Sequence, residues 1–560
     1  MSARQLCLGL GLLGLLACAS PEPSPAPAPT EQGAEGTGGG EGTGGGEGTG
    51  GGEGTGGGEG TGEGTGGTGR GADPDGERLR VSAQGTQSGA PGAGFSERVL
   101  TDGQSYISDV VRGPDRSAVP GSRPAPLLEI GDPFNGQGPV QEGIQLPGGA
   151  VINPSLLVFG TFRSAIQIFD DGDDVTPGVF DADEPVSEWA NRLDLFANLR
   201  LTATERFLVG LRPLDDEDRG FVGYRFTPDQ RDGWRDSFDG TLSTLFFEGE
   251  IGEMFPNLDP NDDSLLDIGV SVGRQPLLFQ DGVMINGTMD AVGLVKNSLR
   301  FLPGSINTRL TALFAFPDVT TDRRNLMGLF TAHDFAGTYV ELDGAYLNSR
   351  DRAGSGAFVG AGFTQRLGSF NTTFRYNGSF RIGESDGTVE NGTLLSWEVS
   401  LNVGKDLLVP DLIYLNGFWG IDRYRSAFRG NGAGTPLGRV GILYASPGLG
   451  RYGSLLADQP DRAVAGNGRA LTGADRSVGL ALGYQLYLGS AYRQQLIFEL
   501  GGRRSTSDGV HVGAVAFATR YQIALGNRVV VLTEGFVGAQ EAESPFVSSS
   551  GARLEVLVKF

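Results

Sequence analysis

The chain has 560 residues, of which 94 are glycine, and its formal net charge is -23. A protein that binds nucleic acid needs a basic face for the phosphates, so this charge argues against nucleic acid as a partner. The two histidines, His333 and His511, have no carboxylate at a useful spacing. We therefore expect neither a histidine-based nucleophile nor a zinc site, and no enzyme.

The first twenty residues have the features of an export signal. Arg4 is the only positive charge there, and the apolar run that ends at Leu16 is too short to span a bilayer. The sequence Leu-Leu-Ala-Cys at residues 15-18 resembles the lipobox of bacterial lipoproteins. This resemblance implies a signal peptide over residues 1-17, a covalent lipid on Cys18, and handling by the lipoprotein-sorting machinery. A chance cysteine in an ordinary signal peptide is the alternative.

Two low-complexity regions follow the predicted lipid anchor. Residues 18-72 are rich in proline and then in a Glu-Gly-Thr-Gly-Gly-Gly repeat, which buries nothing and predicts a disordered tether. Residues 73-150 remain polar and rich in turn residues, with short apolar pieces. We expect an irregular segment that either plugs the domain after it or extends into the periplasm.

From residue 151 to residue 560 the apolar residues recur with a period of two. In residues 192-202, leucines occupy one face, whereas Arg192, Asp194 and Arg200 occupy the other. Such strands fit either a soluble barrel or sandwich with an apolar interior or a membrane barrel with an apolar exterior. Segment lengths of about ten residues, charges in the middle of strands, and alternating short and long turns favour the membrane barrel. The predicted fold class is thus all-β: a transmembrane antiparallel β-barrel.

Turn lengths predict about eighteen strands. The expected strands lie near residues 156-169, 191-202, 206-214, 241-253, 264-275, 290-300, 306-316, 324-333, 338-348, 357-366, 370-381, 394-404, 411-421, 475-488, 494-504, 511-523, 528-538 and 551-560. Residues 422-474 would raise the count to twenty if they formed a hairpin rather than a loop. The weak pattern of residues 324-333 leaves sixteen as the lower alternative.

The last strand ends the chain at Phe560, with Ala552, Leu554, Val556 and Val558 on the same face. This segment resembles the terminal strand of bacterial outer-membrane barrels, whose final aromatic residue is read by the barrel-assembly machinery. Residues 189-212 and 273-279 also resemble hairpins of the alginate-export group of porins, although the rest of that group's pattern is absent after residue 275. The resemblance implies an outer-membrane porin with no cofactor, surrounded by lipid and lipopolysaccharide and compatible with a homotrimer.

The charged face of the strands supplies the candidate pore lining. It consists of Arg163, Arg192, Arg200, Arg212, Arg309, Arg366, Arg375, Arg520 and Arg553, with Asp194, Glu248, Glu250, Asp267, Glu341, Asp343 and Glu398. Opposed rows of arginine and acid orient polar solutes at a constriction. The slight arginine excess in this set predicts anionic solutes, whereas mutual pairing of these groups would leave little selectivity.

Acidic loops offer a weak calcium site. Asp170, Asp171, Asp173 and Asp174 lie in one predicted outer loop, and oxygen-rich loops suit Ca²⁺, but no EF-hand loop is present. A solvated acidic surface is the simpler interpretation.

Two functions remain open on the sequence alone. The first is a lipid-anchored outer-membrane channel for passive diffusion of small hydrophilic solutes. The second is a structural or adhesin-type surface barrel whose lumen is plugged. Conductance separates them, because a plugged barrel passes no current.

Overall fold

The computed structural model describes residues 124–131, 143–170, 185–202, 204–215, 221–226, 233–258, 266–300, 302–316, 324–349, 354–384, 389–403, 411–430, 436–445, 449–450, 452–457, 474–488, 493–507, 513–541 and 547–560. The chain divides into two units, Met1–Glu77 and Arg78–Phe560, and all described residues belong to the second. The predicted signal peptide, Cys18 and the tether lie outside the described residues.

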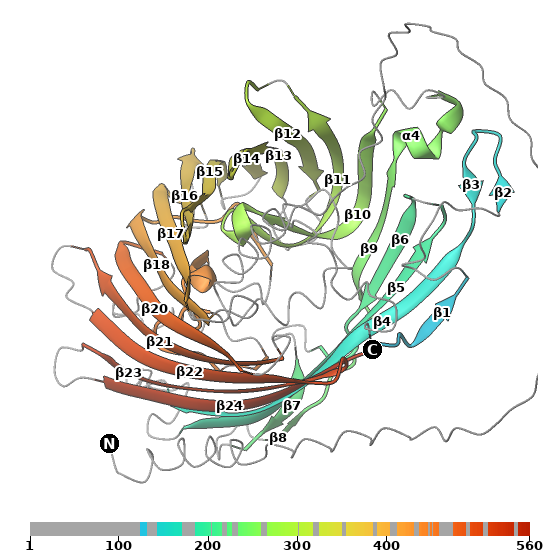
Figure 1. Cartoon of the computed structure of the whole chain (residues 1–560). Coiled ribbons are helices and arrows are strands. Elements are labelled where there is room, and N and C mark those ends of the chain that lie inside the picture. The colour runs from blue at the N-terminus through green and yellow to red at the C-terminus, as the bar shows by residue number, and fades with distance from the viewer. Residues whose placement is uncertain are drawn as a thin grey trace, which may run out of the picture. The chain divides into compact units, whose positions relative to one another are not determined.

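Eighteen antiparallel strands in the described part of the chain form a closed barrel (Figure 1). They are β4 (Ser155–Asp170), β5 (Val186–Arg200), β6 (Arg206–Leu211), β9 (Leu242–Glu250), β10 (Ile268–Phe279), β11 (Ile285–Leu299), β12 (Ser305–Ala315), β13 (Arg324–Phe335), β14 (Thr338–Ser349), β15 (Ser355–Leu367), β16 (Phe370–Ile382), β17 (Gly392–Val403), β18 (Asp411–Asp422), β20 (Ser477–Leu488), β21 (Gln494–Ser505), β22 (Gly513–Leu525), β23 (Val529–Gln540) and β24 (Val547–Lys559). The predicted fold class and strand count are confirmed.

Both alternatives to eighteen strands are wrong. Residues 324–335 form a full strand, paired on both sides with β12 and β14. Residues 423–476 join β18 to β20, and these two strands pair directly with each other. The connection therefore adds no strand to the wall.

The exposed outer side chains of the barrel are mainly apolar, whereas the inner face carries small and polar side chains together with a buried apolar cluster that includes Phe330 and Phe358. In β20 the exposed fraction is 50% for Leu480 and 48% for Leu482, but 0% for Ala481 between them. The same alternation runs through β21, where Phe498 and Leu500 are exposed and Glu499 is buried. A soluble barrel has the opposite distribution, so this exterior suits lipid contact.

Short elements accompany the wall. They are β1 (Leu128–Ile130), β2 (Ile144–Gln145), β3 (Val151–Ile152), β7 (Val222–Arg225), β8 (Gly233–Arg235), β19 (Phe428–Arg429), α4 (Ile251–Met254), and the 3₁₀ turns η3 (Pro256–Leu258), η4 (Gln280–Gly282) and η6 (Pro436–Arg439). Strand β7 pairs with β5 beyond the end of β6, and β8 pairs with β7. No helix in the described ranges is long and apolar enough to cross a membrane.

The barrel closes between its last and first strands. Strand β24 pairs with β4 from Ser550, opposite Asp170, to Lys559, opposite Thr161. Phe560 and Gly160 then exchange two backbone hydrogen bonds of 3.0 and 2.8 Å. Just beyond them, β1 pairs with β4 at Leu156, Leu157 and Val158, so this piece of residues 73-150 lies along the edge of β4.

Candidate functional site

A long connection narrows the interior of the barrel. Residues 436–457 belong to the connection between β18 and β20, and we call their described parts the inner strap. Its turn η6 lies on the inner side of the wall (Figure 1), where Pro436, Leu437 and Arg439 meet Ser396 and Glu398 of β17. Because strand alternation turns Ser396 and Glu398 inward, the strap occupies the lumen side.

One buried carboxylate anchors the inner strap to β21. Glu499 accepts the backbone N–H groups of Ile442 at 3.0 Å and Leu443 at 2.8 Å. The Tyr414 hydroxyl of β18 donates to the same carboxylate. Charge-assisted hydrogen bonds to a buried carboxylate are among the stronger polar contacts in proteins, so Glu499 holds the strap against the wall.

Tyrosine hydroxyls of the same connection add further attachments. The Tyr444 hydroxyl donates to the carbonyl of Gly502 in β21, and the Tyr424 hydroxyl donates to the carbonyl of Val283 at 3.1 Å. Burial raises the pKa of both tyrosines, so both hydroxyls remain protonated donors at neutral pH.

Glycines on the inner face of the wall make room for the strap. A Cβ at Gly501 would lie 2.9 Å from Leu443 Cδ1 and 3.0 Å from Leu456 Cδ1. A Cβ at Gly538 would lie 2.8 Å from Leu455 Cδ2. These distances are shorter than van der Waals contact, so a larger residue at either position would require the leucine side chains of the strap to shift.

A second, shorter segment enters the lumen between β10 and β11. Its residues Gln280 and Asp281 both have φ near +53°, a left-handed conformation that is costly for side chains larger than glycine. The Asp281 carboxylate pairs with Arg375 of β16 and, at 2.9 Å, with Arg439 of the inner strap. Asp281 therefore ties the short segment to both the wall and the strap.

Further contacts join the start of the long connection to the same short segment. Ser426 Oγ donates to the carbonyl of Val283 at 2.7 Å, and the Ala427 N–H donates to the carbonyl of Met284 at 2.9 Å. Strand β19 then runs parallel to the start of β11. The two inward connections thus form one structure.

A chain of alternating charges lines the wall across the closing seam. Arg163 of β4 pairs with Glu555 of β24 at 2.6 Å, and Arg553 of β24 pairs with Glu534 of β23 at 2.9 Å. Glu534 also pairs with Arg520 of β22. All five residues are at most 8% exposed, so each charge depends on its neighbours for compensation.

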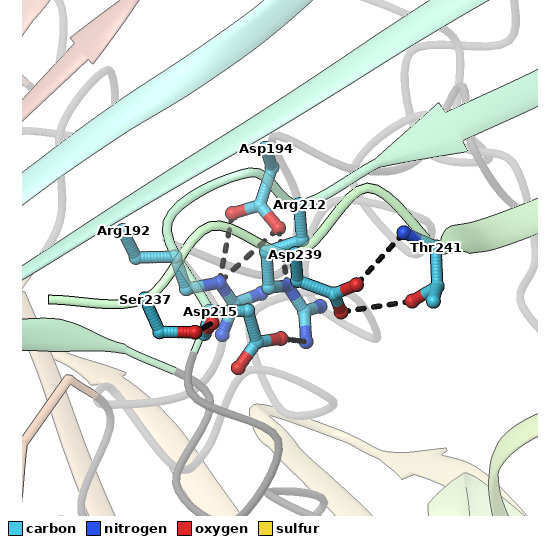
Figure 2. A network of polar contacts seen from close by, with 7 residues as sticks. All are labelled: Arg192, Asp194, Arg212, Asp215, Ser237, Asp239 and Thr241. Carbon is cyan, nitrogen blue, oxygen red and sulfur yellow. Dashed lines mark hydrogen bonds and ion pairs between the residues drawn. The ribbon is translucent and has the colours of Figure 1, made fainter.

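Another network lies where β5 meets the connection after β6 (Figure 2). Asp194 sits between two guanidinium groups, with Arg192 Nε at 2.9 Å and Arg212 Nε at 2.9 Å. Arg212 also reaches the Asp215 carboxylate at 3.2 Å. Burial raises the pKa of Asp215, and the nearby Arg212 acts in the opposite direction.

The other residues predicted to line the pore differ in burial and in their partners. Glu248 is buried and paired with Arg206, Glu341 pairs with Arg375 at 3.2 Å, and Asp343 accepts a 2.6 Å hydrogen bond from Gln280. Glu398 is buried on β17 near Arg375 and Arg439. Arg200, Arg309, Glu250 and Asp267 are half-buried, and Arg366 is exposed at a turn, where its Nε donates to the carbonyl of Gly368.

Most of the predicted calcium ligands lie outside the described residues. Asp170 ends β4, whereas Asp171, Asp173 and Asp174 lie outside the described residues. Within the described ranges, no group of three or more histidine, cysteine or acidic side chains is arranged to hold a metal ion.

Sequence reasoning missed four residues that organise the lumen. Glu499 and Glu534 lie in phase with the inner face of strands that the two-residue period predicts, so that period could have found them. Asp281 and Arg439 belong to inward connections that have no repeating pattern. Nothing in their local sequence indicates that they meet.

Comparison with known proteins gives matches at the level of architecture. No family model matches the sequence, and no curated protein matches it. A BenF-like porin from Pseudomonas fluorescens is 11% identical, with 72% of this chain and 99% of that chain covered and a TM-score of 0.45. OccAB3 of Acinetobacter baumannii is 12% identical, with 72% and 99% covered and a TM-score of 0.43. Wzi of Escherichia coli, an outer-membrane protein involved in capsule assembly, is 11% identical, with 70% and 83% covered and a TM-score of 0.38.

At these identities and TM-scores, the function of this chain has to be argued from its own residues. The resemblance of residues 189-212 to alginate-export porins likewise stays a prediction.

Proposed function

We propose that this chain is an outer-membrane channel that passes small hydrophilic solutes by passive diffusion. The observation that carries the proposal is the distribution of the wall, with an exposed apolar exterior around an interior that contains buried arginines and carboxylates. Among β-sheets, only a closed barrel satisfies its backbone hydrogen bonds in lipid, and interior charges suit water and polar solutes. The inner strap narrows that interior on one side.

The proposed orientation follows from the turns. The first barrel residue, Ser155, and the last, Phe560, lie at the same end, which also carries the two-residue turn between β15 and β16. In outer-membrane barrels the short turns face the periplasm. The connection that supplies the inner strap then enters from the cell exterior.

Pairing of the lumen charges supports weak ion selectivity. The arginines at 163, 192, 212, 375, 520 and 553 each contact a carboxylate within 3.2 Å. A paired guanidinium presents little net charge to a passing ion. We therefore propose that the anion preference suggested by the arginine excess is small.

Single-channel recording tests the proposal. Purified full-length protein in a planar bilayer is expected to give a steady open conductance, with a reversal potential close to zero in a salt gradient. A reversal potential that shows strong anion selectivity would instead support the hypothesis that the lumen arginines select anionic solutes. Silence from a barrel shown to be folded would contradict the channel.

The anchored strap favours one second candidate, a plugged structural barrel. Glu499, Asp281 and the wall glycines hold the strap firmly in the lumen. Silence in the bilayer, together with a conductance that appears when the strap is cut away, would support this candidate.

A further inference from the structure

The outer face of the barrel carries a hollow at the end opposite the chain terminus. It has a volume of about 620 Å³ and is lined by Trp419, Ile421, Asp422, Arg476, Val478, Thr506 and Ser507. Trp419 of β18 lies directly opposite Val478 of β20. Trp419, Ile421 and Val478 are all exposed on the outward face, so they form an apolar floor.

The polar rim of the hollow is built on an unusual backbone. Asp422 has φ of 54° and Arg476 has φ of 38°, two of five non-glycine residues in the described ranges with positive φ. The Arg476 N–H donates to the carbonyl of Asp422 at 2.9 Å, and the Thr506 N–H donates to the carbonyl of Arg476 at 2.6 Å. Non-glycine residues held in this conformation tend to occur at functional sites, because the surrounding contacts have to maintain them.

One arginine, Arg476, lines this rim, and a second, Arg504, lies beside the hollow. Arg476 faces Asp422 at 3.7 Å, and both side chains are more than half exposed, so their pairing is weak. Arg504 is also exposed, lies on the outward face of β21, and is directly opposite Val478. Side chains opposite each other on paired strands are about 5 Å apart at Cβ, so Arg504 borders the apolar floor.

We propose that this hollow binds a phosphate-bearing lipid of the surrounding leaflet. The acyl chain lies along Trp419, Ile421 and Val478, and the phosphate is held by Arg476 and Arg504. Guanidinium groups bind phosphate through paired charge-assisted hydrogen bonds, and tryptophan is enriched where a membrane meets water. The inference rests on the proposed membrane placement but not on conductance.

A lipid fits the hollow better than a free anion does. The floor is apolar and open to the exterior. Such a surface does not strengthen the binding of inorganic phosphate, but an acyl chain that covers it removes apolar area from water, which favours binding. Arg476 of the rim is paired only weakly with Asp422, and the neighbouring Arg504 adds a second positive charge beside the hollow. An anionic headgroup is therefore the matching partner.

Native mass spectrometry of the full-length protein in detergent tests the assignment, with phosphatidylglycerol as the probe. The wild type is expected to retain phosphatidylglycerol, while Arg476→Ser/Arg504→Ser loses affinity by at least about tenfold. The matched control Arg300→Ser/Arg528→Ser removes two exposed arginines from the turns at the other end and is expected to bind like the wild type. Heat-modifiable mobility on gels confirms that each variant is folded.

Three results would overturn the proposal. One is equal retention of phosphatidylglycerol by the wild type and the Arg476→Ser/Arg504→Ser variant. Another is displacement of the bound lipid by millimolar inorganic phosphate, which would assign the site to a free anion. The third is unchanged binding in Trp419→Ala, because that would remove the role of the apolar floor. None of these depends on channel activity, so the lipid site and the channel can fail separately.

Discussion

At the scale of single residues, the interior depends on groups that satisfy one another. Glu499 is 1% exposed, and its carboxylate serves two backbone N–H groups of the inner strap. Removing one partner from such an arrangement leaves buried donors without acceptors, at about 1–3 kcal/mol each. The charged residues of the lumen therefore stabilise the interior structure of the barrel.

The first prediction concerns Glu499. In Glu499→Ala, the N–H groups of Ile442 and Leu443 lose their acceptor, so we expect the strap to loosen and the single-channel conductance to rise with larger open-state noise. Recordings in a planar bilayer check this. Glu390→Ala is the matched control, because that carboxylate forms only ion pairs of 3.9 and 4.0 Å. Identical recordings from the two variants would show that Glu499 does not hold the strap.

The second prediction concerns Gly501. A valine here would place a Cβ 2.9 Å from Leu443, so Gly501→Val is expected to displace the strap and to lower the temperature at which the barrel unfolds on gels. Gly344→Val is the control, since a Cβ at Gly344 has nothing within 4 Å. A Gly501→Val barrel as stable as the control would mean that the wall accommodates the added methyl groups.

At the scale of elements, the sequence predicts strands well and inward connections poorly. The period of two, together with the turn lengths, places the eighteen wall strands near their observed bounds, although residues 324–333 show that period only weakly. The period arises because lipid outside and water inside act alternately on the residues of a strand. Residues 423–476 have no such period. The position of their described parts is set by contacts with β17 and β20–β24, hence by residues such as Glu499 and Gly538 that lie elsewhere in the sequence. The pairing of Asp281 with Arg439, across 158 positions, is equally invisible locally.

The third prediction concerns the seam. Deleting Phe560 removes both backbone hydrogen bonds to Gly160 and the terminal aromatic residue expected to be read by the assembly machinery. We expect less folded barrel in the membrane fraction, measured as the heat-modifiable band. Phe560→Tyr keeps the aromatic ring and the backbone bonds and should assemble normally. Normal assembly of the deletion variant would argue against a role for this residue.

At the scale of the whole molecule, the barrel and the predicted lipid anchor would each attach the protein to the membrane. The apolar exterior holds the barrel in a membrane without help, whereas acyl chains at Cys18 would contribute about 0.8 kcal/mol per buried methylene. We therefore expect a lipid on Cys18 to serve sorting, assembly or a second attachment point rather than retention of the folded barrel.

The fourth prediction tests this separation. Cys18→Ala is expected to remove the acyl mass, seen by mass spectrometry, while leaving a heat-modifiable barrel with wild-type conductance. Export continues in this variant if the apolar head alone serves as the signal. Loss of the folded barrel would show that the anchor is required for assembly.

The alternating charges across the seam have a consequence for the order of assembly. Glu555 and Arg163 lie on the last and first strands of the wall, so their pairing exists only after the ends of the chain have met. Before that step Glu555 retains Arg553, but Arg163 lacks its carboxylate partner. The ion pair thus stabilises only the closed ring and contributes nothing to the open sheet that precedes it.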